Sequence, residues 1–232
     1  NGLSMEDWLK YAPEDSLSLF MFQKPKTAKR LYFDVIPKTV DEYLTFAEKL
    51  KTETDPEKIL QNPAWHIHAG TAPDREIPLS FGILLNLVSV CNTDDRDLLW
   101  KFISRYATGA TPETSPYLDK LVGYAINYYS DFVKPTKSYR APTEAEKAAL
   151  QDLRDTLAKI APGTDPSDIQ TEVFTVGKNH NYENLRDWFK TLYEVLLGQE
   201  QGPRMGSFIA LYGLDESVAL IDRALAGEDL SA

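Results

Sequence analysis

The sequence predicts an all-α protein. Apolar residues recur at intervals of three and four in segment after segment, which is typical of amphipathic helices. Capping residues or prolines precede most of these segments. No Asn-Gly or Asp-Gly pair lies between alternating apolar runs, so nothing indicates a β-hairpin. We therefore expect roughly nine to eleven helices with short connections and no solenoid repeat.

Helix-start signals predict four helices in about the first sixty residues. Ser4 fits the N-cap of a first helix, with Asp7 as its partner three residues later. Pro13 suits the first turn of a second helix. A third helix is expected after Pro37, and Asp55–Pro56 begin a fourth. The third helix carries an apolar stripe at helical spacing: Val40, Tyr43, Leu44, Ala47 and Leu50.

Residues 62–78 form the best candidate boundary, because prolines and a glycine interrupt them and they lack helical periodicity. The segment 79–91 is apolar nearly all round, which predicts a helix buried on several sides, although its valines keep a strand open. We place one region at residues 1–77 and a second at 78–232. The second region can be divided further into 78–163 and 164–232.

The second region repeats the same pattern of start signal and apolar stripe. Thr143 and Glu146 have the spacing of a capping box, and Gly198 fits just past the most regular stripe, over residues 185–196. The remaining predicted helices are expected to begin near Asp95, Pro116, Asp165–Pro166 and in the last thirty residues.

The 232-residue chain has a formal net charge of −10. An acidic surface repels nucleic acid, so an RNA partner would require clustered positive charge. One cluster is Lys24, Lys26, Lys29 and Arg30, between the apolar blocks 17–22 and 31–36. It is either a basic edge for an anionic partner or an ordinary solvated face over a core.

A second cluster follows a predicted helix end and holds Lys134, Lys137, Tyr139 and Arg140 in a loop interrupted by Pro135. Unpaired bases are bound by aromatic stacking and edge donors, and phosphates by lysine or arginine. The alternative is a solvated basic loop. Arg204 lies in a glycine-rich turn that lacks the features of a phosphate-binding loop, so its role stays open.

Other functional classes find little support. Trp65-His66-Ile67-His68 invites a metal site, but 3 His and one Cys are too few, so we expect no metal and imidazoles that hydrogen-bond to the backbone. No hydrolase or transferase constellation is present. The single cysteine, Cys91, excludes an internal disulfide, which fits a reducing cytoplasm. We expect its thiol to be buried. No signal peptide is visible, and the longest apolar run, 78–91, is too short to span a bilayer.

Four stretches, taken together, carry a family resemblance: Ala12–Leu44, Asn62–His68, Asp131–Arg140 and Gly202–Phe208. They resemble the class I lysyl-tRNA synthetases. Asn1-Gly2-Leu3-Ser4 is similar to the end of that family's mobile Lys-Ser-Lys loop. The His-x-Gly-His-type signature and the nucleotide-binding fold are missing from this sequence. The chain therefore resembles the carboxy-terminal portion of such an enzyme.

The resemblance implies a helical stem-contact region at 1–77 and an anticodon-binding α-helical cage at 78–232. The parent enzyme would attach lysine to its tRNA with ATP and Mg, while this chain alone would hold no cofactor and be inactive. We expect a cytoplasmic monomer that binds lysine-accepting tRNA but neither DNA nor membrane. The expected contacts are Lys24, Lys26, Lys29 and Arg30 on the stem side and Lys134, Lys137, Tyr139, Arg140 and Arg204 beyond it.

Two alternatives remain open. The chain could be a helical protein-interaction or regulatory module without RNA binding, which the acidic total favours. It could also be the anticodon-binding tail of a glutamyl-type synthetase. The resemblance to glutamyl enzymes is confined to the last quarter of the chain.

Overall fold

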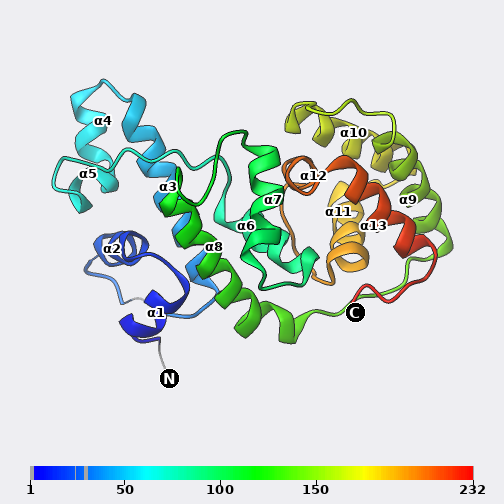
Figure 1. Cartoon of the computed structure of the whole chain (residues 1–232), viewed down its shortest axis with the longest axis horizontal. Helices are drawn as coiled ribbons and strands as arrows, with labels where there is room; N and C mark the ends of the chain where they lie inside the picture. Colours follow the sequence, from blue (N-terminus) through cyan, green and yellow to red (C-terminus); the bar gives the residue numbers. More distant parts are fainter. Residues whose placement is uncertain (1–2, 24, 29–30, 232) are drawn as a thin grey trace. The chain divides into compact units, whose positions relative to one another are not determined.

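All regular structure that the computed structural model describes is helical (Figure 1), which confirms the predicted fold class. The described residues are 3–23, 25–28 and 31–231. Within these ranges there are thirteen α-helices and three short π or 3-10 segments, more than expected. No helix in the described part of the chain is long and apolar enough to cross a membrane.

The chain packs as two units that are discontinuous in sequence. The first comprises Asn1–Leu85 with Gly109–Tyr128, and the second Asn86–Thr108 with Tyr129–Ala232. Packing therefore divides the chain differently from the expected boundary at residue 77, because α8 (Pro116–Tyr128) packs against α1 (Met5–Tyr11) of the first unit. The functional assignment of residues 1–77 and 78–232 stays a prediction.

The first unit confirms the predicted caps. The Ser4 side chain accepts a hydrogen bond from the Asp7 amide at 3.1 Å, and the Asp7 carboxylate accepts one from the Ser4 amide at 3.0 Å. Asp55 caps its helix through the Glu57 amide at 2.9 Å. The helices of this unit besides α1 and α8 are α2 (Glu14–Phe22), α3 (Val35–Thr52), α4 (Pro56–Gln61), α5 (Pro63–Ile67) and the start of α6 (Phe81–Cys91).

Two expectations for this unit are wrong. Helix α3 begins at Val35 rather than after Pro37. A proline in the first turn costs nothing, since the amides there have no partner within the helix. The short helix α5 lies inside the segment expected to be non-helical. It forms because the Asn62 side chain accepts a hydrogen bond from Ala64 N at 2.9 Å and Pro63 occupies the first helical position.

The second unit is built around one buried core. Trp188 is fully buried and donates its indole N–H to the Val173 carbonyl at 2.9 Å. The capping box of Thr143 and Glu146 is formed as predicted. The helical segments are α7 (Arg96–Tyr106), η1 (Tyr129–Val133), η2 (Lys134–Thr136), α9 (Glu144–Leu157), α10 (Pro166–Asn179), α11 (Leu185–Leu192), η3 (Tyr193–Leu197), α12 (Met205–Tyr212) and α13 (Leu214–Leu225).

Helices α10 and α12 lie side by side (Figure 1). They approach each other closely at Gly206. The Gly206 amide donates to the buried Gln170 side chain at 2.6 Å. A Cβ atom on Gly206 would lie 2.2 Å from the Pro166 carbonyl oxygen, and one on Gly202 would lie 2.4 Å from the Tyr193 ring. Both glycines therefore permit a close approach that a larger residue would prevent.

Candidate nucleic-acid interface

The predicted RNA-contacting loop, residues 134–140, follows η1 and η2 and is fastened to the second unit through its backbone. The Ser138 amide donates to the Gly198 carbonyl at 2.8 Å, and the Arg140 amide donates to the Glu194 carbonyl at 3.5 Å. Gly198 has a φ of 66°, a conformation that glycine adopts without strain. The loop is thus anchored beside the end of η3.

Arg140 is held by two carboxylates. Its Nη1 and Nη2 donate to the two oxygens of Glu146, both at 2.8 Å, and its Nε donates to Glu194 at 2.5 Å. The paired guanidinium lowers the pKa of Glu146 to about 2, chiefly through these hydrogen bonds. Arg140 therefore joins the loop to α9 and η3, and its charge is neutralised within the protein.

Lys137 turns into the protein. Its Nζ donates to the Ser89 carbonyl at 2.8 Å and lies 5.5 Å from the Tyr129 ring centroid and 5.2 Å from that of Tyr139. Desolvation, with a smaller contribution from nearby Lys134, lowers the Lys137 pKa to about 8. The amine therefore connects the loop to the end of α6 and contributes little charge to the surface.

The Tyr139 side chain is half-buried against the neighbouring backbone. A Cβ atom on Gly198 would lie 2.8 Å from the ring, so this ring lies directly against the Gly198 backbone. Burial is the first cause that raises its pKa to about 12. Because Lys137 also lies over the ring, the aromatic surface available for stacking an unpaired base is reduced.

Among the predicted RNA contacts of the second unit, two cationic side chains are exposed. Lys134 lies in η2 and is exposed, although the residues after it are fixed. Arg204 is also exposed, immediately before α12, and its Nη2 donates to the Ser167 hydroxyl at 3.3 Å. These side chains are able to reach a phosphate without breaking an ion pair.

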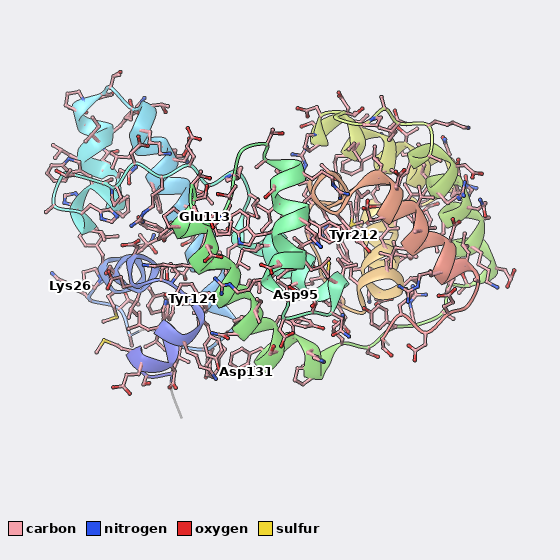
Figure 2. The ribbon with its side chains drawn as sticks, viewed as in Figure 1. Lys26, Asp95, Glu113, Tyr124, Asp131 and Tyr212 are labelled. Atoms are coloured by element: carbon pink, nitrogen blue, oxygen red, sulfur yellow. The ribbon has the colours of Figure 1, made fainter. Side chains whose placement is uncertain are left out.

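The first basic cluster belongs to the first unit. Lys26 is exposed on the turn that follows α2 (Figure 2). Lys24, Lys29 and Arg30 lie outside the described residues, so their predicted contact with an anionic partner stays a prediction.

The histidine pair is occupied by hydrogen bonds. His66 Nε2 lies 2.6 Å from the Leu60 carbonyl oxygen, as the prediction of backbone bonding requires. His68 Nε2 instead lies 2.7 Å from the Tyr43 hydroxyl, so backbone bonding is wrong for this ring. No cluster of three or more His, Cys, Asp or Glu side chains suited to a metal occurs in the described ranges.

The sequence did not indicate a groove of about 580 Å³ in the second unit. It lies between the end of α7, the α9–α10 connection and the start of α13, and Arg105 lines it. Its walls come from segments more than a hundred residues apart, whose proximity no local pattern shows. The only sequence feature that pointed to this groove was Arg105, a basic residue in the last turn of α7.

The comparisons with known proteins agree with the resemblance. Residues 1–71 match the family described as tRNA synthetases class I (K). The lysine–tRNA ligases of Rickettsia felis (strain ATCC VR-1525 / URRWXCal2) and Rickettsia peacockii (strain Rustic) are each 52% identical over 226 residues. The match covers 97% of this chain and 43% of each relative, in the carboxy-terminal portion. The chain thus spans less than half the length of these relatives.

Proposed function

We propose that this chain, which corresponds to a fragment of a class I lysyl-tRNA synthetase, binds and orients tRNA for an enzyme that attaches lysine to it. The observation that carries the proposal is 52% identity to lysine–tRNA ligases over 97% of the chain. ATP and Mg would serve the whole enzyme, and the bond-making residues would lie in its other part. Residues 1–77 would contact the stem and the remainder the anticodon, in a cytoplasmic monomer.

The geometry of the 134–140 loop supports different roles for its cations than the sequence predicts. Arg140 and Lys137 are positioning residues, because carboxylates and a carbonyl already occupy their donors. Lys134 and Arg204 are the phosphate contacts, since both are exposed. Charge-assisted bonds from lysine and arginine to phosphate give the salt-dependent part of RNA affinity.

One observation favours a second function. Large apolar side chains of the first unit are exposed, among them Met5 at 64%, Met21 at 53% and Leu60 at 54%. Where such side chains form one contiguous patch, they are typical of protein-interaction sites. A protein-binding module would use them without any RNA contact.

Filter retention of transcribed lysine tRNA, with glutamate tRNA as competitor, tests the proposal. We expect retention that excess lysine tRNA abolishes and that glutamate tRNA reduces much less. Absence of retention would favour the protein-interaction function. Equal competition by the two tRNAs would favour a glutamyl-type tail.

A further inference from the structure

The groove of the second unit has the size and lining of a small-ligand site. Its volume, about 580 Å³, falls within the range of about 300–1,000 Å³ found for such sites. Leu157, Ile160, Ile169 and Leu214 give it an apolar wall, while Tyr106 and Arg105 line the α7 side. An apolar wall with a few polar groups suits a flat, weakly polar ring.

Arg105 retains hydrogen-bond donors at this groove. Its Nη1 donates to Glu216 at 2.7 Å and its Nη2 donates to the Tyr212 carbonyl at 2.6 Å. Tyr212 lies at the end of α12 (Figure 2). A guanidinium has five N–H groups, so donors remain beyond these two bonds. The side chain is 49% exposed but fixed at its tip, which holds the remaining donors in place.

The charges of the groove select against phosphate. Asp165, Asp215 and Glu216 line it together with Arg105, so carboxylates outnumber the cation. Asp165 is engaged in capping α10 through Ser167 N at 2.7 Å, and Glu216 is paired with Arg105. Asp215 is exposed and provides an acceptor. A neutral group with both acceptor and donor atoms fits these charges better than an anion does.

We propose that this groove holds one unpaired nucleobase of the bound RNA, a base with a carbonyl next to an imino N–H, which is uracil or guanine. Arg105 donates to the carbonyl, Asp215 accepts the imino hydrogen, and the phosphates stay outside on Lys134 and Arg204. The inference rests on the proposed function and adds Arg105 as a specificity-determining residue.

The test measures the affinity of the 232-residue chain for transcribed lysine tRNA, using Arg105→Gln and Glu216→Gln. Both variants remove the same ion pair, so both carry its structural cost. Arg105→Gln should weaken binding about tenfold or more, as expected for a lost base contact. Its salt dependence should match that of the wild type, because no phosphate contact is lost. Glu216→Gln should bind at least as tightly as the wild type, since a donor is released.

A tRNA series identifies the base. Each unpaired uridine or guanosine of the anticodon loop is replaced in turn by adenosine, which lacks the carbonyl. One replacement should weaken the wild type about as much as Arg105→Gln does, and should weaken the variant no further, because the two changes remove the same contact.

Three results would overturn the inference while the proposed function stands: unchanged affinity of Arg105→Gln, an equal loss in Glu216→Gln, or a loss with reduced salt dependence. If the wild type itself fails to bind tRNA, the proposed function fails and the inference with it. Thermal melting of each variant establishes that the second unit is folded.

Discussion

Arg140 shows what a sequence can and cannot indicate about a charged residue. Its position beside Lys134 and Lys137 predicts an RNA contact, since charge and loop signals are local. Its partners, Glu146 and Glu194, come from α9 and η3, and only the fold brings their carboxylates to the guanidinium. Breaking a paired, partly buried charge destabilises a protein more than losing an exposed one. A loss of RNA binding in an Arg140 variant would therefore report on loop structure.

Lys137 gives the residue-scale prediction. Its pKa in the folded protein is about 8, below the ordinary lysine value of 10.5. Between these values the unfolded chain binds more protons than the folded one, so the contribution of Lys137 to stability rises with pH. We expect the wild type to gain about 1 kcal/mol relative to Lys137→Met between pH 7 and 9.5, a value reduced for partial exposure.

Urea unfolding of both proteins at each pH measures this difference. The comparison stops at pH 9.5 because tyrosine ionisation contributes above it. Lys134→Met serves as the control, since that side chain is exposed, and should show no comparable trend. A difference between wild type and Lys137→Met that stays flat or falls with pH would contradict burial of the amine.

At the scale of elements, the helix starts were the most predictable features. Ser4, Asp55, Thr143 and Asp165 all cap helices as expected, because a cap depends on residues within one turn. The start of α6 has a local cap, in which the Ser80 hydroxyl accepts from Ile83 N at 3.1 Å, and a second cap from another helix that no local pattern shows. Asp41 on α3 accepts hydrogen bonds from Phe81 N at 2.6 Å and Gly82 N at 3.0 Å.

Removal of this tertiary cap should loosen the start of α6. Asp41→Ala is expected to cost about 1–2 kcal/mol, the range for loss of a helix cap. Hydrogen exchange of peptides that contain Phe81 and Gly82 should accelerate. Asp41→Asn, which keeps an acceptor oxygen, should lie between the wild type and the alanine variant. Unchanged exchange in Asp41→Ala would show that these amides are satisfied in another way.

The contact between α10 and α12 gives a second prediction at this scale. Gly206→Ala should destabilise the second unit by about 1–3 kcal/mol, because the added Cβ meets the rigid backbone of α10. Gly206→Val should cost more. Ser207→Ala, at the next position of α12, is the control and should change the unfolding midpoint little. A Gly206→Ala protein as stable as the wild type would contradict the close approach.

For the whole molecule, the fold class and the family resemblance were predictable and the division into units was not. Helical periodicity and four dispersed motifs are properties of the sequence itself. The assignment of residues 109–128 to the first unit depends on packing between α8 and α1, which lie more than a hundred residues apart. The Arg105 groove was unpredictable for the same reason, as its lining runs from residue 105 to 216.

The central claim is that a chain of net charge −10 binds RNA through a few exposed cations. The most direct test is the affinity for lysine tRNA over a range of salt concentrations, for the wild type and Lys134→Ala. We predict that log K falls linearly with log salt and that Lys134→Ala lowers the slope by about one, while Lys178→Ala, a similarly exposed lysine on α10, does not. Binding that is absent, or that salt leaves unchanged, would contradict the account.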